Sequence, residues 1–149
     1  MSSSTGLAGL IIREVGLEDL DSVRLMNREI FEEERIINTF ERQHLMILVA
    51  EVDGLPAGFK IGYRENRFVF YSAKGAVMPE FRRLGLAGLM LHDMIERVRP
   101  SGYRRFAFDT FPNRHPGMTV LALKEGFRVV QADYNPTYRD FRLRFEMRL

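Results

Sequence analysis

The chain has 149 residues, of which 46% are hydrophobic, and its 22 basic and 20 acidic residues leave a net charge of only +2. This length and apolar fraction predict one globular domain with a sizeable core. The near balance of charge gives no strong support for nucleic acid as a partner. The absence of cysteine excludes disulfides, thiolate metal sites and a cysteine nucleophile.

The beginning of the chain is small and polar, without the basic start and apolar centre of a signal peptide. We interpret residues 1–9 as a flexible tail and residues 10–149 as a single domain. No apolar run reaches the ~18 residues needed to cross a bilayer. We therefore expect a cytoplasmic protein with no membrane partner.

The domain is predicted to open with a strand and a helix. Residues 11–15 form a short apolar run, and the acidic residues of the segment 16–19 favour the start of a helix. Apolar side chains then recur at helical spacing as far as Phe31, with Asn27 as the one polar member. Residues 32–42 are expected to form a second short helix or an irregular segment.

Three antiparallel strands are predicted next. Residues 45–52 form an apolar run, Asp53-Gly54 is a strong hairpin signal, and residues 57–63 return as the second strand. Residues 68–77 form the third strand, in which Lys74-Gly75 interrupts the alternation and indicates a β-bulge.

Helices and strands alternate in the second half of the chain. A helix is predicted over residues 85–99, and its core face carries Ala87, Met90, Leu91, Met94 and Val98. The following elements are expected to be a buried strand over 104–110, a short helix over 116–124, a strand over 127–134, and a last strand with strict apolar–charged alternation from Phe141 to Leu149. This order implies a mixed sheet with helices on its faces.

The most informative segment joins the third of these strands to the long helix and reads Arg82-Arg83-Leu84-Gly85-Leu86-Ala87-Gly88. A helix N-terminus presents unpaired N–H groups and a partial positive charge. The small residues let a ligand approach that backbone, and the arginines add positive charge. The segment therefore predicts a phosphate-binding loop. It has neither the Lys-Ser/Thr of a Walker loop nor the three glycines of a dinucleotide fingerprint.

The spacing Arg82-x-x-Gly85-x-Ala87 resembles the acyl-CoA pyrophosphate loop of the GNAT superfamily of N-acetyltransferases, Arg/Gln-x-x-Gly-x-Gly/Ala. Val77-x-Pro79-x-Phe81, Asn113 and the pair Gly126-Phe127 are also similar to that family. The resemblance spans about residues 11–149. It implies an α/β (α+β) GNAT fold: a mixed, mostly antiparallel sheet of six to seven strands, flanked by about four helices, with the fourth and fifth strands splayed apart.

The resemblance also implies a function. The protein is expected to move an acetyl group from acetyl-CoA, its co-substrate, to a primary amine of a small molecule or peptide by direct attack in a ternary complex, without a metal. The pantetheine arm of coenzyme A would pair with the splayed strand, and a backbone N–H at the end of that strand would stabilise the thioester oxygen. The implied cofactor-binding residues are Ala76, Val77, Met78, Arg82, Arg83, Leu84, Gly85, Leu86, Ala87, Gly88 and Asn113. A helix cap is the alternative role for Asn113.

The catalytic residues are less clear from the family pattern. Its usual general acid is a tyrosine four residues before the glycine of Gly-Phe, and Ala122 occupies that position. Tyr134 and Tyr138, beside the last loop, are the substitutes we consider first, with ordinary loop aromatics as the alternative. Departure of the thiolate without an acid is a further alternative, because thiols titrate at ~8.5. Tyr71 is a further candidate, although a strand tyrosine is more often part of the core. For the base we favour Glu33, which is equally compatible with a solvated helix end.

Two other functions are considered. Ala122 motivates a non-catalytic acyl-CoA-binding regulatory module. Nucleic-acid binding would rest on Arg139, Arg142, Arg144 and Arg148, but Glu146 interrupts this basic face and no aromatic platform is evident, so we expect no nucleic acid. The three scattered histidines predict no metal site. A homodimer is compatible with the sequence.

Overall fold

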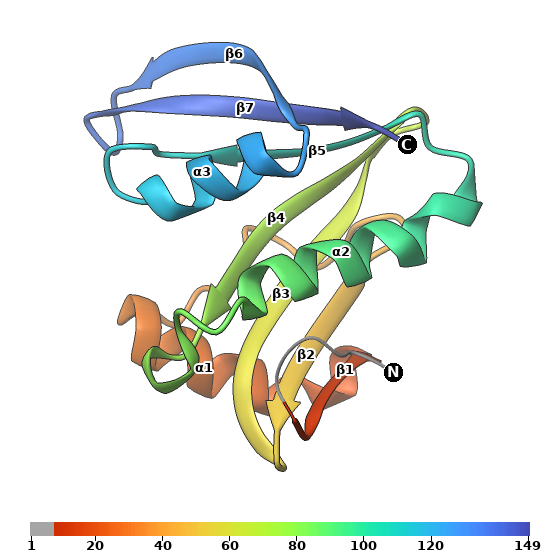
Figure 1. Cartoon of the computed structure of the whole chain (residues 1–149), viewed down its shortest axis with the longest axis vertical. Helices are drawn as coiled ribbons and strands as arrows, with labels where there is room; N and C mark the ends of the chain where they lie inside the picture. Colours follow the sequence, from red (N-terminus) through yellow and green to blue (C-terminus); the bar gives the residue numbers. More distant parts are fainter. Residues whose placement is uncertain (1–7) are drawn as a thin grey trace.

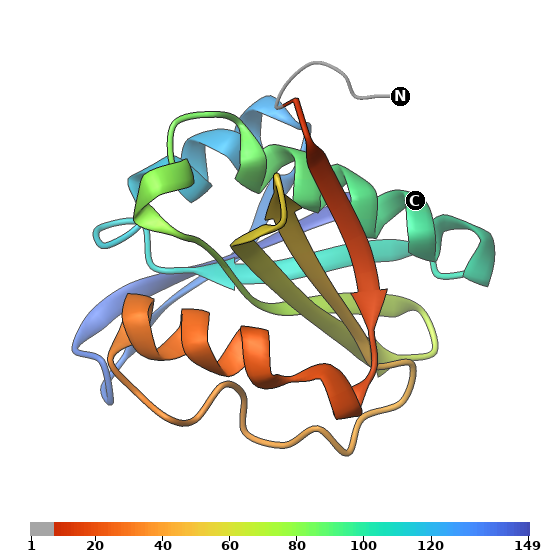
Figure 2. The ribbon, with the colours of Figure 1, turned by 90° about the horizontal axis from the view of Figure 1, so that it is seen from below.

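The computed structural model of the protein describes residues 8–149. Within that range one seven-stranded sheet is enclosed by helices on both faces (Figure 1, Figure 2). Residues 1–7 of the predicted tail lie outside the described residues. The backbone N–H of Asp53 donates to the carbonyl of Gly9, at 3.1 Å, so the described part of the chain begins beside the first hairpin.

The sheet has the order β1-β2-β3-β4-β5-β7-β6, and only β4 and β5 run parallel. The strands are β1 (Leu10–Val15), β2 (Met46–Val52), β3 (Leu55–Asn66), β4 (Val69–Val77), β5 (Arg105–Thr110), β6 (Arg128–Asn135) and β7 (Asp140–Arg148). The α-helices are α1 (Asp21–Phe31), α2 (Leu86–Val98) and α3 (Pro116–Lys124), with 3-10 turns at Leu17–Asp19, Pro79–Phe81 and Arg99–Ser101. The predicted mixed, mostly antiparallel sheet is confirmed, with three α-helices in the described residues where about four were expected.

The two faces of the sheet have separate apolar cores because successive strand residues point to opposite sides. On one face α1 packs its buried residues, among them Val23 and Met26, against Phe59 and Ile61 of β3. On the other face lie α2, which packs against β2, β3 and β4, and α3, as Figure 2 shows. Their core includes Phe70, Phe106 and Phe145.

Asn27 is the polar member of the apolar stripe of α1, and it is completely buried. Its side-chain amide donates to the backbone carbonyls of Glu33, at 2.9 Å, and Arg35, at 3.3 Å. The segment 32–42 is irregular, not helical. Asn27 therefore replaces the hydrogen bonds that a second helix would have supplied, and it fixes the path of this loop.

Two local predictions need correction. The register of β3 against β4 passes from Ile61 with Lys74 to Gly62 with Ser72, so the bulged residue is Ala73 and not the predicted pair that follows it. The buried side of α2 includes Leu86 and Ile95 in addition to most of the predicted residues, whereas Ala87 is exposed. The helix begins one residue later than predicted, with Gly85 as its left-handed N-cap.

The site is positioned by the divergence of β4 and β5. Their parallel pairing covers only Val69 to Ser72 against Arg105 to Phe108. Beyond this point the strands separate, as Figure 1 shows on its left side, and residues 73–77 of β4 have no strand partner on the β5 side. The predicted splay of the fourth and fifth strands is therefore present.

Candidate active site

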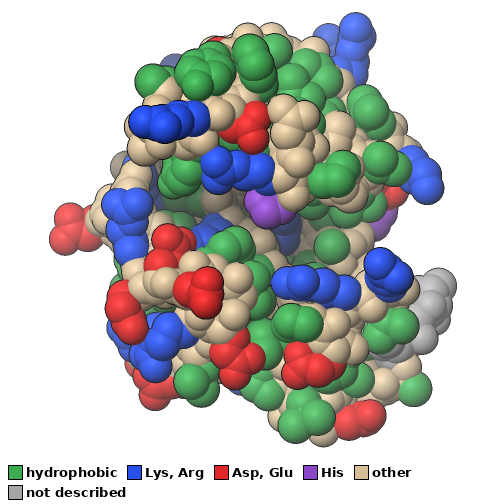
Figure 3. Space-filling model, turned by 90° about the vertical axis from the view of Figure 1, so that its left-hand side faces the viewer, with side chains coloured by type: hydrophobic (Ala, Val, Ile, Leu, Met, Phe, Trp, Pro, Cys, Tyr) green, Lys and Arg blue, Asp and Glu red, His purple; other side chains and the backbone are tan. Residues whose placement is uncertain are grey.

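A cleft opens where β4 and β5 separate. Figure 3 looks into this side of the molecule and shows a hollow between an upper and a lower half, with Lys and Arg side chains on both rims. The lower half contains the end of β4 and the loop before α2, and the upper half contains β6, β7 and α3 (Figure 1). The cleft therefore lies between the two groups of elements that carry the predicted site residues.

The loop before α2 presents a row of free backbone donors. The N–H groups of residues 83–88 find no acceptor among the described residues, and the first N–H of this helix to find one is that of Leu89, which donates to the carbonyl of Gly85 at 3.1 Å. Free N–H groups at a helix start bind anions because the helix dipole adds partial positive charge. The predicted phosphate-binding residues Arg83, Leu84, Gly85 and Gly88 thus lie on one continuous donor surface with Leu86 and Ala87.

The backbone of this loop is held in an unusual conformation. Gly85 has φ +82° and Arg83 has φ +64°, both in the left-handed region that ordinary residues avoid. A Cβ built on Gly85 would meet nothing within 4 Å, so the space in front of the loop is open. The Arg82 guanidinium donates through Nε to the carbonyl of Val77, at 3.0 Å, and ties the loop to the end of β4.

The opposite rim of the cleft is built around Asn113. Its side-chain amide donates to Asp140 at the start of β7, at 2.9 Å, and Nη2 of Arg114 donates to the carbonyl of Tyr138, at 2.7 Å. The hydrogen bond from Asn113 holds the pKa of the Asp140 carboxyl below its usual range. The helix-cap reading of Asn113 is wrong, because the N-cap of α3 is His115. Asn113 instead fastens the loop after β5 to the β6–β7 turn.

The predicted base, Glu33, lies next to the free part of β4. Its carboxylate accepts a hydrogen bond from Lys74 of β4, at 2.9 Å, and the Lys74 ammonium lies 4.3 Å from the ring centre of Phe31. Its backbone carbonyl is held by Asn27. These contacts bring a half-exposed carboxylate from the α1–β2 loop to the strand that borders the cleft.

The two predicted tyrosines lie at different places on the upper half. Tyr138 packs edge-on against Phe111, which follows β5, with ring centres 5.2 Å apart. Tyr134 is on β6 and packs against Phe141, at 5.3 Å. Both rings are about half exposed. Ala122 is fully buried in the core under α3, so its position offers neither a hydroxyl nor access to solvent.

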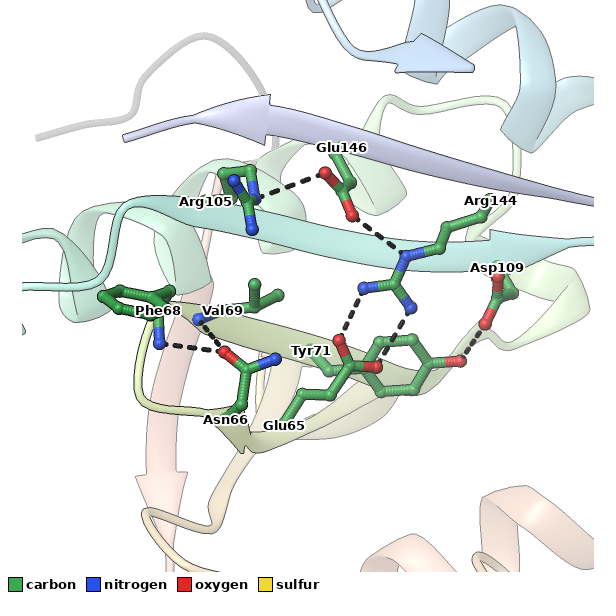
Figure 4. A network of polar contacts seen from close by, with 9 residues as sticks. All are labelled: Glu65, Asn66, Phe68, Val69, Tyr71, Arg105, Asp109, Arg144 and Glu146. Atoms are coloured by element: carbon green, nitrogen blue, oxygen red, sulfur yellow. Dashed lines mark hydrogen bonds and ion pairs between the residues drawn. The ribbon is translucent and has the colours of Figure 1, made fainter. Parts of the chain in front are cut away.

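A polar network lies on the face of the sheet opposite α2 and α3, at the point where β4 and β5 part (Figure 4). The Tyr71 hydroxyl donates to the Asp109 carboxylate, and burial together with this hydrogen bond raises the pKa of Tyr71. The Arg144 guanidinium donates to both oxygens of Glu65 and to Glu146. A small polar depression of about 70 Å³ is lined here by Asp109, Gln131, Asp133, Arg142 and Arg144.

Two charged residues near the cleft were missed from the sequence. Asp109 is the acidic residue that interrupts the buried strand β5, and Lys60 is the charged residue within the buried part of β3. A charge inside an apolar strand was the available signal. Tyr71, the further candidate for the acid, is partly buried, and its hydroxyl donates a hydrogen bond to Asp109.

The C-terminal arginines are partly neutralised by neighbouring acids. Arg142 forms an ion pair with Asp133, at 3.5 Å, and Arg144 pairs with Glu65 and Glu146. Within residues 8–149, no three His, Asp or Glu side chains are grouped in a way that suits a metal ion. Of the helices described, none combines the length and apolar character that a bilayer span requires.

Comparisons with known proteins agree with this geometry. The family model described as acetyltransferase (GNAT) domain matches residues 27–115. Among solved structures, an IAA acetyltransferase from Bacillus cereus is 18% identical with a TM-score of 0.81, covering 94% of this chain and 99% of its own. A GNAT family acetyltransferase from Elizabethkingia anophelis with acetyl-CoA bound is 17% identical with a TM-score of 0.74, and the coverage is 95% and 99%.

The ribosomal-protein-S18-alanine N-acetyltransferase from Escherichia coli is 16% identical with a TM-score of 0.79, and 93% of each chain is covered. No curated protein sequence matched the chain. Identities this low show a shared fold, whereas the match of the family model extends over more than half of the chain. The chain therefore belongs to the GNAT acetyltransferase family.

Proposed function

We propose that the protein transfers an acetyl group from acetyl-CoA to a primary amine of a small molecule or peptide. One observation carries the proposal: the row of free N–H groups at residues 83–88 stands at the mouth of the cleft between β4 and β5. Such donors suit the pyrophosphate of coenzyme A. Membership of the GNAT acetyltransferase family and the acetyl-CoA seen in the Elizabethkingia structure support the same conclusion.

The residues of the cleft suit each part of acetyl-CoA. The open space in front of Gly85 admits a phosphate close to the backbone. Residues 73–77 of β4 offer a strand edge to the amides of the pantetheine arm, which would pair with it as an added strand. Asn113 would support the arm from the other rim by ordering the loop after β5.

The chemistry needs four contributions from the chain. The cleft holds amine and thioester together, which supplies much of the rate. A backbone N–H near Ala76, Val77 or Met78 would stabilise the negative thioester oxygen. The amine must lose a proton to attack, and Glu33 is the proposed acceptor, with Lys74 holding its carboxylate beside β4. Tyr134 and Tyr138 remain candidates for the proton donor, and neither has a hydroxyl hydrogen bond within the described residues.

Two matched glycine variants test the pyrophosphate site. Gly85 and Gly102 have similar φ values, +82° and +87°, and a Cβ on either would meet nothing within 4 Å. Gly85→Ala and Gly102→Ala should therefore lose similar stability, about 1 kcal/mol, through the left-handed backbone. Only Gly85→Ala should weaken acetyl-CoA binding, by about tenfold or more, because its methyl group occupies the space a phosphate needs.

Calorimetric titration with acetyl-CoA and with acetyl-pantetheine, which lacks the pyrophosphate, completes the test. Acetyl-pantetheine should bind the parent and Gly85→Ala equally weakly. Equal acetyl-CoA affinity for the parent and Gly85→Ala would refute the assignment. Tight acetyl-CoA binding without transfer to any amine would instead favour the regulatory module that Ala122 suggests.

A further inference from the structure

Lys60 is a largely buried lysine whose amine has no partner among the described residues. It lies in the middle of β3, between Leu48 of β2 and Gly75 of β4 in the sheet register, and only 6% of its surface is exposed. Within the described residues, Nζ has neither a hydrogen-bond acceptor nor a carboxylate in salt-bridge range. Buried lysines are normally paired, so this one calls for an explanation.

The side chain of Lys60 lies on the face of the sheet that α2 covers. Its sequence neighbours Phe59 and Ile61 pack toward α1, so strand alternation turns Lys60 the other way. Gly58 and Gly62 share this face, and a Cβ on them would lie 2.9 Å from Met90 and 3.0 Å from Met94 of α2. The two glycines let the helix approach closely on either side of Lys60.

The stem of Lys60 lies over Gly75 of β4, the strand that borders the cleft. Its Cγ lies 3.5 Å and its Nζ 3.6 Å from the position that a Cβ of Gly75 would take. The Lys60 side chain therefore lies across the backbone of Gly75, which has no side chain to occupy this space. Gly75 belongs to the part of β4 that has no strand partner on the β5 side. The amine consequently lies beside the strand edge proposed to receive the pantetheine arm.

The surroundings of the amine carry no charge. Leu48 of β2 and Gly75 of β4 pair with Lys60 in the register, and Met90 and Met94 of α2 lie over its neighbours Gly58 and Gly62 on the same face. Burial lowers the pKa of Lys60 from 10.5 to about 8. A thiol titrates near ~8.5, so the amine and a departing thiolate are closely matched for proton transfer.

We propose that Lys60 donates the proton to the coenzyme A sulfur as the acetyl group leaves, and so supplies what the side chain of Ala122 cannot. This inference rests on the proposed function and assigns a catalytic residue to it. The place of Lys60 beside the free edge of β4 carries the proposal.

The step balances as follows. The amine nitrogen of the acceptor bonds to the thioester carbon, and the carbon–sulfur bond breaks with its electron pair on sulfur. The Lys60 ammonium gives one proton to that sulfur and becomes a neutral amine. The acceptor nitrogen loses one proton to the base or to water, and Lys60 regains a proton from solvent. The net products are the acetylated amine and coenzyme A as a thiol.

The test compares the parent with Lys60→Met, Lys60→Gln and Lys124→Met, the last being an exposed lysine at the end of α3. The first readout is the thiolate absorbance of bound coenzyme A as a function of pH. In the parent, the ammonium should make the bound thiol titrate below free coenzyme A, whereas in Lys60→Met burial should make it titrate above. We expect a difference of about one pH unit or more between parent and variant.

Turnover is the second readout, and we expect a fall of about a hundredfold for Lys60→Met and none for Lys124→Met. Identical thiol titration in the parent and both Lys60 variants would overturn the proposal. The same holds if turnover falls for Tyr134→Phe or Tyr138→Phe and not for Lys60→Met. Calorimetry distinguishes failure of the Lys60 proposal from failure of the proposed function. A parent protein that does not bind acetyl-CoA would contradict the proposed function itself.

Discussion

At the scale of single residues, the proposed proton donor Lys60 should also lower the stability of the folded protein, because its charged amine is largely buried. Burial lowers its pKa from 10.5 to about 8, so between these values the unfolded chain keeps a proton that the folded chain has lost. The unfolded state then binds more protons, and the free energy of unfolding rises with pH across this window. Below about pH 8 both states are charged and the folded protein bears the full cost, about 3 kcal/mol for a shift of this size.

Lys60→Met should therefore be more stable than the parent at neutral pH, by about 2–3 kcal/mol, because an apolar side chain of similar length replaces a buried charge. The gain should shrink as the pH rises above about 8 and disappear above 10.5, where the parent amine is neutral in both states. Urea denaturation across this range measures the difference, with Lys124→Met as the control. A variant less stable than the parent at neutral pH would show that the amine is favourably paired.

At the scale of elements, a single hydrogen bond fastens the point where β4 and β5 part. The hydroxyl of Tyr71 on β4 donates to the carboxylate of Asp109 on β5, one residue beyond the last paired position of that strand. Tyr71→Phe should lower the free energy of unfolding by about 1–2 kcal/mol, since a partly buried carboxylate loses a donor. Tyr63→Phe is the matched control, because Tyr63 neighbours Tyr71 and its hydroxyl forms no hydrogen bond within the described residues.

Denaturation curves for the two variants decide the matter. Equal losses for Tyr71→Phe and Tyr63→Phe would show that ring packing, and not the hydrogen bond, holds the strands together at this point. A loss confined to Tyr71→Phe would show that this hydrogen bond holds β4 and β5 together at the point where their backbone pairing ends.

The second connection between elements joins the β5–α3 loop to β7 through Asn113. Asn113→Ala should weaken acetyl-CoA binding several-fold while changing the melting temperature little, because the contact lies at the surface. The pKa of Asp140 should rise toward its usual value, since the donor that lowers it is gone. Calorimetry and carboxyl NMR titration measure the two effects. Unchanged affinity together with a shifted Asp140 would restrict Asn113 to a local structural role.

At the scale of the whole molecule, the sequence predicts elements better than contacts between them. The bounds of α3 match the prediction because Pro116 at its first turn and Gly126 after its end are local signals. The bulge is displaced by one residue because its position depends on the register with β3. The contact between Tyr71 and Asp109 joins residues 38 apart, and the burial of Lys60 depends on how α2 packs. Neither the Tyr71–Asp109 contact nor the burial of Lys60 is indicated by a pattern in the neighbouring sequence.

The candidate site divides in the same way. The loop at residues 83–88 was identified because one continuous segment carries its glycines, its arginines and the start of a helix. The contacts of Glu33 and Asn113 could not be predicted from the sequence, because their partners Lys74 and Asp140 come from distant parts of the chain. Residues that act through their neighbours become apparent only once the sheet is assembled.

The central claim is that the protein transfers an acetyl group from acetyl-CoA to an amine. Its most direct test measures the yields of coenzyme A and acetylated amine in one reaction. The protein is incubated with acetyl-CoA and a panel of small-molecule and peptide amines, and free coenzyme A and acetylated amine are quantified together by mass spectrometry. The cleft between β4 and β5 predicts equal amounts of the two products for at least one amine, with both strongly reduced in Gly85→Ala and unaffected in Gly102→Ala. Acetyl-CoA that binds tightly but yields no acetylated amine with any member of the panel would contradict the claim.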